Sequence, residues 1–206
     1  MALIGITGGI GAGKTAVLNI LGSYGARIWD ADVAVHELYL PGREGFAAAV
    51  QRWGRAVLTV EGGLDRQAVA ARVFASPVER EWLEAQVHPL VQKNMEDTAA
   101  RFPSPLFCAV PLLFEVGWQD RFAAVITVWC DPETQRRRLL ARGWTEAEMA
   151  ARLQAQLPAN EKLDRADLAI INNGSLDLLR EQCRRVWDIL QRAKHNLRTN
   201  ENAGTH

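Results

Sequence analysis

Residues 8–15 read Gly-Gly-Ile-Gly-Ala-Gly-Lys-Thr and match the pattern G-x-x-x-x-G-K-[S/T] at every position. Glycines allow the backbone to turn tightly and to direct several N–H groups toward one bulky anion, and a helix that follows adds its positive dipole end. In such a loop the lysine reaches the β- and γ-phosphates and the hydroxyl binds Mg²⁺. The motif predicts a nucleotide site with these residues: Gly8, Gly9, Gly11, Ala12, Gly13, Lys14, Thr15 and Ala16.

Two aspartates, Asp30 and Asp32, follow a short apolar segment at 26–29 that should lie beside this loop. A kinase needs a carboxylate near the γ-phosphate to accept or orient the proton of the acceptor hydroxyl. An aspartate in front of a helix can instead cap it. Residues two apart on an extended segment point in opposite directions. We therefore expect one aspartate to cap the next helix and the other to act in catalysis.

An arginine cluster follows Pro132. Arg138 and Arg142 are four residues apart on an expected helix, so they should share one face. Arginines there can neutralise charge on a transferring phosphoryl group, as a mobile lid does in small kinases. The alternative is a solvated basic face, and we interpret Arg136 and Arg137 in that way.

A phosphate loop alone leaves the reaction open. A GTPase would need an Asn-Lys-x-Asp motif after a late strand, and the sequence has none. A motor ATPase would normally carry an acidic pair after an apolar strand, and the run at 106–113 is followed only by Glu115. An ATP-binding regulatory protein would not need the carboxylate at 30–32. A small-metabolite kinase fits best, and a nucleoside or nucleoside-monophosphate kinase and a regulator stay as alternatives.

Apolar segments alternate with helical ones along the chain. Strands are expected at 2–7, 26–29, 106–113, 123–130 and 167–171. Helices are expected at 14–24, from Asp32 to about 40, over most of 43–102 with a kink or break near His88, from Pro132, and from Ser175 onward. This order predicts an α/β fold, a P-loop NTPase-type three-layer sandwich with a parallel five-stranded sheet, a helical substrate-binding insertion and a helical lid. Function should lie at the carboxyl ends of the strands.

The composition excludes several function classes. The 206 residues contain 24 basic and 24 acidic side chains, so no basic excess suggests nucleic acid as a partner. Three widely spaced cysteines, the absence of a charged leader and the lack of an apolar run of about 18–20 residues predict a soluble cytoplasmic protein without membrane association. Monomer and weak homo-oligomer both stay open.

Several stretches resemble the dephospho-coenzyme A kinase family, in order and spacing, over the chain to about residue 195. They lie at 6–15, 29–32 (Trp-Asp-Ala-Asp), 62–66, 88–90, 110–115 (Val-Pro-Leu-Leu-Phe-Glu), 138–142, 156–162 and 171–174. The resemblance implies transfer of the γ-phosphate of ATP, with Mg²⁺, to the ribose 3′-hydroxyl of 3′-dephospho-CoA.

The resemblance also implies roles for individual residues. Asp32 would be the catalytic carboxylate, Lys14 and Arg142 would act on the phosphoryl group, and Thr15 would bind the metal. The remaining sites would be Arg138, Asn172 and Asn173 at the nucleotide and His88, Leu112 and Glu115 at the acceptor. The implied division is a core at about 1–60, 103–141 and 165–197, a substrate subdomain at about 61–102, a lid at about 142–164 and a disordered tail at about 198–206.

Two positions depart from the family pattern. Many members have an aspartate just before Pro-Leu-Leu, where this chain has Ala109 and Val110. If that aspartate serves the metal elsewhere, Glu115, Asp32 or water must take its place here. Many members also have aspartate where this chain has Asn172, which can still form a hydrogen bond with adenine.

Overall fold

A computed structural model describes residues 2–203, and their side chains as far as residue 192. The chain divides into two compact units. The sheet unit comprises Met1–Ile28 and Ser104–His206, and the helical unit comprises Trp29–Pro103. Within residues 2–203, no helix has both the length and the apolar character needed to cross a membrane.

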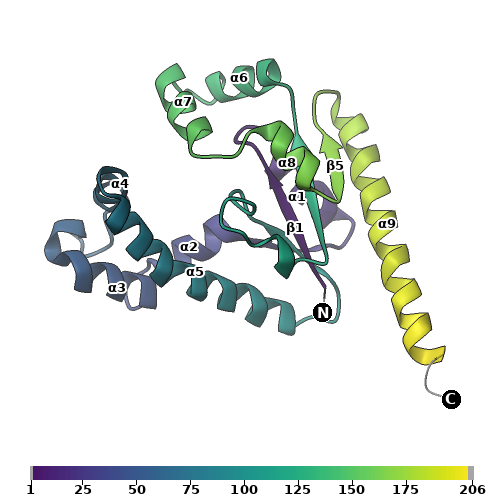
Figure 1. Cartoon of the computed structure of the whole chain (residues 1–206), viewed down its shortest axis with the longest axis horizontal. Coiled ribbons are helices and arrows are strands. Elements are labelled where there is room, and N and C mark those ends of the chain that lie inside the picture. Colours follow the sequence, from purple (N-terminus) through teal and green to yellow (C-terminus); the bar gives the residue numbers. More distant parts are fainter. Residues whose placement is uncertain (1, 204–206) are drawn as a thin grey trace. The chain divides into compact units, whose positions relative to one another are not determined.

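Five strands form one sheet in the order β2-β3-β1-β4-β5, of which β1 and β5 are labelled in Figure 1. They are β1 (Leu3–Gly8), β2 (Arg27–Asp30), β3 (Leu106–Ala109), β4 (Ala124–Trp129) and β5 (Leu168–Ile171). The pairs β1–β3, β1–β4 and β4–β5 are parallel, with Ile6 opposite both Ala109 and Ile126. The predicted α/β architecture with a five-stranded parallel sheet is confirmed.

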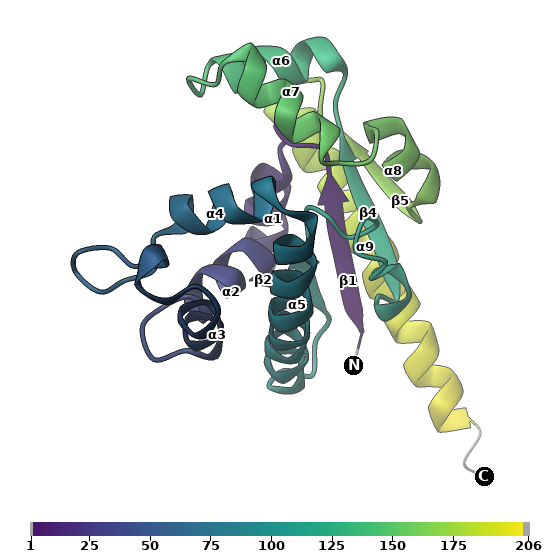
Figure 2. The same ribbon diagram turned by 60° about the vertical axis from the view of Figure 1, so that its left-hand side comes forward.

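The two units carry different helices (Figure 2). Those of the sheet unit are α1 (Lys14–Ser23), α6 (Pro132–Leu140), α7 (Glu146–Gln154), α8 (Ala159–Arg165) and α9 (Leu176–Ala203), with a 3₁₀ turn η2 (Gln119–Arg121). Those of the helical unit are α2 (Ala31–Leu38), α3 (Glu44–Trp53), α4 (Arg66–Ala75) and α5 (Pro77–Ala100), with η1 (Gly54–Val57). The expected substrate subdomain, 61–102, falls inside the helical unit, which begins earlier in the chain.

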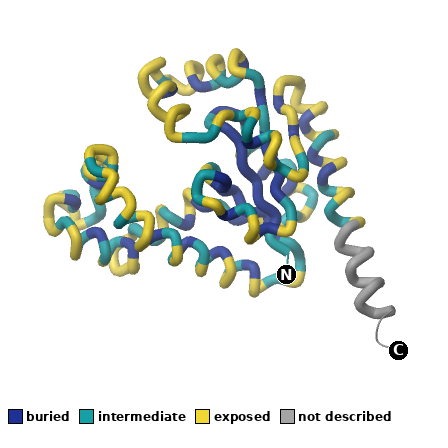
Figure 3. Tube along the Cα trace, in the orientation of Figure 1, coloured by how far each residue is buried: buried dark blue, intermediate teal, exposed yellow. Residues whose placement is uncertain are grey.

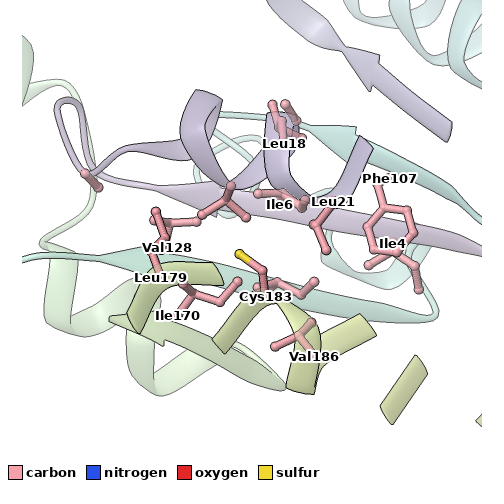
Figure 4. Close-up of a cluster of buried hydrophobic side chains, with 14 of the residues drawn as sticks. Ile4, Ile6, Leu18, Leu21, Phe107, Val128, Ile170, Leu179, Cys183 and Val186 are labelled. Carbon is pink, nitrogen blue, oxygen red and sulfur yellow. The ribbon is translucent and has the colours of Figure 1, made fainter. Parts of the chain in front are cut away.

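The alternation of side chains along β1 builds a core on each face of the sheet. Ile4 and Ile6 are buried in a cluster with α1 and α9, to which Leu21 and Cys183 contribute (Figure 4). On the other face, Gly5 is so close to Leu113 and Phe122 that an added Cβ would lie 2.6 Å from the Leu113 side chain. Burial is accordingly concentrated in the strands of the sheet unit (Figure 3).

Local capping signals placed the starts of α5, α6 and α7 correctly. The Asp131 side chain accepts a hydrogen bond from the Thr134 N–H at the start of α6. Thr145 and Glu148 form the reciprocal capping box of α7. Ser76 caps α5 by accepting from the Glu79 N–H, with Pro77 in the first turn. Each cap satisfies a backbone N–H that has no partner inside the helix.

Two expectations from the sequence are wrong. The strand expected at 106–113 ends at Ala109, because the chain turns at Pro111 and buries Leu113 and Phe114 below the sheet instead of extending it. A kink or break was expected near His88, and the break is absent: α5 continues through Pro89, so packing outweighs the lost N–H at that position. The expected tail, 198–206, lies partly in α9, which ends at Ala203, and partly outside the described residues.

Candidate active site

The glycine loop connects β1 to α1, as its sequence predicted. Lys14 Nζ donates to the carbonyl oxygens of Gly8 at 2.9 Å and Gly9 at 3.1 Å, which holds the ammonium group against its own loop. Thr15 is exposed in the first turn of α1. The positive end of this helix and the lysine therefore face the same loop, an arrangement that suits an anion with several oxygens.

Two glutamines bond the peptide groups of Ile10 at the tip of this loop. Gln135 Nε2 of α6 donates to the Ile10 carbonyl oxygen at 2.7 Å. The Ile10 N–H donates to Gln156 Oε1 at 3.1 Å, from the segment between α7 and α8. The sequence analysis assigned no role to either glutamine, because the function of a glutamine side chain depends on hydrogen-bond partners that the sequence does not reveal. The loop tip is thus fixed from two sides by residues far from it in the chain.

Asn172, at the end of β5, packs on the other side of the loop. Its Nδ2 donates to the Ala12 carbonyl oxygen at 2.8 Å, and its Oδ1 accepts from Arg138 Nη2 at 3.3 Å. Arg138 Nη1 also donates to the Ala12 oxygen at 3.3 Å. The Asn172 side chain is buried, with 6% of the residue exposed. The structure therefore brings together residues 12, 138 and 172, three of those that the sequence assigned to the nucleotide, through one connected set of hydrogen bonds.

A cavity of about 420 Å³ opens beside these groups. Arg138 and Arg142 line it together with Asn172, but Arg142 lies beyond the end of α6, in a turn where its N–H donates to the Leu139 carbonyl oxygen. The expectation that both arginines belong to one helix is wrong in that detail, although they line the same space. The complete lining is Gly11, Gly13, Ala16, Arg138, Ala141, Arg142, Asn172, Gly174, Leu176 and Leu179.

The cavity has two chemically different sides. Its glycines and arginines offer backbone groups and positive charge, whereas Leu176 and Leu179 offer apolar surface. Asn173 does not line it but accepts a hydrogen bond from the Asp131 N–H at 2.9 Å, which ties the turn after β5 to the start of α6. A flat heterocycle with an attached phosphate chain matches such a lining, since one part is apolar and the other anionic.

Glu115 and Lys162 form an ion pair that the sequence analysis did not foresee. Their Oε1 and Nζ atoms are 2.7 Å apart, and the Lys162 side chain is completely buried. Lys162 also donates to the Pro111 carbonyl oxygen at 2.8 Å, and Glu115 Oε1 accepts from the Leu157 N–H at 2.8 Å. Glu115 Oε2 is buried and has no hydrogen-bond partner among the residues that the structure describes. Leu112, in the preceding turn, is 39% exposed.

The helical unit carries the two expected aspartates. Asp30 caps α2 by accepting from the Asp32 N–H at 2.8 Å, so one aspartate of the pair caps a helix, as expected. Asp32 is exposed in the first turn of α2. The residue just before the cap is buried, and Trp29 Nε1 donates to Asn94 Oδ1 of α5 at 2.8 Å. The assignment of Asp32 to catalysis stays a prediction.

His88 lies half-buried in α5 of the helical unit. Burial lowers its pKa, because desolvation disfavours the charged imidazolium, and the negative charge of Glu84 opposes that shift. A neutral imidazole at physiological pH can donate or accept a hydrogen bond without carrying charge. Its place in an acceptor pocket remains a prediction.

The residues that follow the loop fit a magnesium ion in one particular way. Mg²⁺ in nucleotide sites usually takes one or two protein oxygens, with phosphates and water completing the octahedron. Thr15, exposed at the loop, would supply one such oxygen from its hydroxyl. Among the side chains that the structure describes, up to residue 192, no group of three or more His, Cys, Asp or Glu gathers into a metal cage.

Comparison with known proteins shows the family to which the chain belongs. The model of a family described as dephospho-CoA kinase matches residues 2–177. The chain belongs to the dephospho-CoA kinase family. A dephospho-CoA kinase from Symbiobacterium thermophilum is 43% identical over 192 residues, which cover 91% of this chain and 80% of that protein. The resemblance inferred from the motifs is therefore confirmed.

Solved structures show the same fold. A Thermus thermophilus protein has 35% identity and a TM-score of 0.80, with 93% of this chain and 97% of that one covered. A dephospho-CoA kinase from Campylobacter jejuni shares the fold, with a TM-score of 0.69 at 22% identity over 93% of this chain and 98% of the other. As a member of the dephospho-CoA kinase family, the chain is an ATP-dependent kinase, and its glycine loop is the loop of a P-loop kinase.

Proposed function

We propose that this chain transfers the γ-phosphoryl group of ATP to the ribose 3′-hydroxyl of 3′-dephospho-CoA, giving CoA and ADP. The observation that carries the proposal is the family match over residues 2–177, in a chain that keeps the complete glycine loop. The cavity beside that loop, with its arginines and its apolar side, supports ATP as the phosphoryl donor.

The nucleotide would use both sides of that cavity. Adenine would lie near Asn172 and the two leucines, and the phosphates would extend toward the loop. Lys14 would exchange its present partners, the Gly8 and Gly9 carbonyl oxygens, for phosphate oxygens. Arg142 would then stabilise charge that accumulates on the transferring group. Asn173 would support this end of the site through its bond to the Asp131 N–H.

The Thr15 hydroxyl would hold Mg²⁺ together with phosphate oxygens and water. The ion would neutralise part of the phosphate charge. With alanine at 109, the chain has no carboxylate at the position where many family members have one. A metal site completed by water and phosphate fits this composition.

The acceptor would be activated from the helical unit. The 3′-oxygen would attack the γ-phosphorus while the bond from that phosphorus to the β,γ-bridging oxygen breaks, and ADP would leave. The hydroxyl proton would pass to the Asp32 carboxylate and from there to solvent. His88 and Leu112 would contact the acceptor. Glu115 was expected to do the same, but its contacts with Lys162 and Leu157 support a different role.

The setting of the enzyme follows from its composition. We infer a cytoplasmic enzyme whose partner is a small molecule and not nucleic acid or a membrane, acting as a monomer or weak homo-oligomer. The three cysteines are free and buried, which fits a reducing compartment. The segment 142–164, with α7 and α8, would act as the lid that excludes water from the γ-phosphate, and 61–102 would bind the CoA portion.

The experiment that tests the function measures ADP release with MgATP and a panel of acceptors: dephospho-CoA, adenosine, AMP, uridine and pantothenate. We expect turnover with dephospho-CoA alone and CoA as its product. Turnover with another acceptor would refute the substrate assignment but keep the P-loop kinase. Absence of ADP release with every acceptor in the panel, while the protein still binds ATP, would favour a regulatory protein.

Asp32→Asn tests the catalytic assignment. The amide cannot accept the hydroxyl proton, so we expect kcat to fall about 100- to 10,000-fold, the usual contribution of a general base. Affinity for MgATP should stay within about twofold, because Asp32 is not assigned to the nucleotide. Asp30→Asn is the matched control, since asparagine caps helices as well as aspartate does. Near-normal turnover of Asp32→Asn would refute the role of this carboxylate.

A further inference from the structure

The buried ion pair between Glu115 and Lys162 is connected to the nucleotide loop by a short series of contacts in the sheet unit. Glu115 Oε1 accepts a hydrogen bond from the Leu157 N–H, and Leu157 directly follows Gln156 in the chain. Gln156 Oε1 in turn accepts the Ile10 N–H at the tip of the loop. Fixing the 156–157 peptide therefore fixes the acceptor that holds Ile10.

Lys162 is itself held from several directions, so the pair can serve as a rigid anchor. Its Nζ contacts Glu115 and the Pro111 carbonyl oxygen, and its own carbonyl oxygen accepts from Thr127 Oγ1 at 3.0 Å. These partners belong to β4 and to the turn after β3. Lys162, in the middle of α8, thus connects this helix to the sheet. Through its bond to the Leu157 N–H, Glu115 also connects the segment before α8 to the same ion pair.

A buried ion pair of this kind is weak as a source of stability. Removing two charges from water costs about as much as their attraction returns, and replacing both partners by apolar residues of similar volume is often neutral. The Glu115 oxygen without a partner makes the pair still less favourable. The pair therefore needs an explanation other than stability. Its hydrogen bond with the Leu157 N–H provides one, because an apolar residue at position 115 could not accept this hydrogen bond.

We propose that Glu115 and Lys162 are positioning residues for ATP binding. They hold the peptide between residues 156 and 157 in place, and this positions the Gln156 side chain to accept the Ile10 N–H. The hydrogen bond to Gln156 in turn keeps the tip of the P-loop in the geometry that binds phosphate. Gln135, on the opposite side, holds the Ile10 carbonyl oxygen. This inference rests on the proposed function only in taking residues 8–15 as the ATP site. It assigns Glu115 to the nucleotide side of the reaction instead of the acceptor side.

Binding of MgADP, measured by titration calorimetry on the full chain, tests the proposal without any acceptor. Gln156→Ala removes the acceptor of the Ile10 N–H and leaves the ion pair intact. We expect about three- to tenfold weaker binding, the range that one hydrogen bond spans. Gln154→Ala, an exposed residue at the end of α7, is the matched control and should bind MgADP as the unchanged chain does.

The double variant Glu115→Leu with Lys162→Met separates positioning from stability. Each single change leaves one buried charge and should lower the unfolding temperature, whereas the double change should largely restore it. We expect the restored double variant still to bind MgADP about three- to tenfold more weakly and to show a raised KM for ATP with kcat within about twofold. A merely structural pair would regain nucleotide affinity together with stability.

Two results would overturn the proposal. One is a double variant that recovers both its unfolding temperature and its MgADP affinity. The other, which holds even if the double variant fails to fold, is Gln156→Ala binding MgADP as tightly as the unchanged chain. The acceptor panel reports separately on the proposed function, because MgADP binding does not depend on which hydroxyl is phosphorylated.

Discussion

Replacing Gly13 by alanine should test the packing of Asn172 on the P-loop, because the two residues are in direct contact. Gly13 has φ 102°, a conformation that residues with a Cβ rarely adopt. A Cβ added there would lie 2.1 Å from Asn172 Nδ2, far inside van der Waals contact. The Asn172 amide would have to move, although its backbone N–H is fixed to the Trp129 carbonyl oxygen at 2.7 Å.

The expected cost has two parts. The left-handed backbone costs alanine about 1–2 kcal/mol. Displacing a buried amide from its hydrogen bonds to Ala12 and Arg138 costs about 1–3 kcal/mol more. We therefore expect Gly13→Ala to lower the free energy of unfolding by about 2–5 kcal/mol. Gly25, beyond the other end of α1, has φ 92° and nothing within 4 Å of an added Cβ, so Gly25→Ala should cost only about 1–2 kcal/mol.

Urea unfolding followed by circular dichroism measures both variants, and a double-mutant cycle identifies the cause. Asn172→Ala removes the group that the new Cβ meets. The double variant should therefore be more stable than the sum of the two single changes predicts, by about 1–3 kcal/mol. Equal costs for the alanines at 13 and 25, together with additive behaviour in the cycle, would refute the close packing that we describe.

Two further predictions concern pH and the helical unit. Because burial lowers the pKa of His88, the unfolded chain binds the proton more readily than the folded chain, and stability should decrease as pH falls below the ordinary histidine value of 6.5. Unfolding temperatures between about pH 5 and 7.5 should thus fall more steeply for the unchanged chain than for His88→Asn, and parallel profiles would contradict this. Glu79 accepts hydrogen bonds from Arg52 and Trp53, which lower its pKa. The Glu79→Gln variant should therefore unfold at a lower temperature than the unchanged chain at neutral pH. This difference in unfolding temperature should disappear as Glu79 becomes protonated below its ordinary pKa of 4.5. A difference that persists in acid would show that side-chain shape and not charge is responsible.

Features governed by neighbours in the sequence were predicted well. The P-loop could be recognised because its glycines, lysine and hydroxyl act within eight consecutive residues between a strand and a helix. The capping of α2 by Asp30 and of α6 by Asp131 depends on contacts over two or three residues. Backbone geometry within one turn is fixed by residue type, so such features can be inferred without knowledge of the fold.

The reach of β3 and the course of α5 were predicted less well. An apolar run at 106–113 satisfies a buried strand and a buried turn equally, since both remove the same side chains from water. Pro89 normally interrupts a helix, but the helical unit keeps α5 continuous because Val87, Val91 and Met95 are buried along it. Burial of this kind depends on the partners of the helix, which local sequence does not reveal.

The sequence by itself determined that the chain carries a nucleotide-binding P-loop on an α/β fold, because those properties follow from local backbone demands and from the period of its apolar residues. Only the tertiary structure decided which distant residues surround that loop. Asn172 meets Ala12 because parallel strands bring their carboxyl ends to one edge of the sheet. The sequence assigned no role to Lys162, and this lysine is buried because Glu115, supplied by a different part of the fold, neutralises its charge.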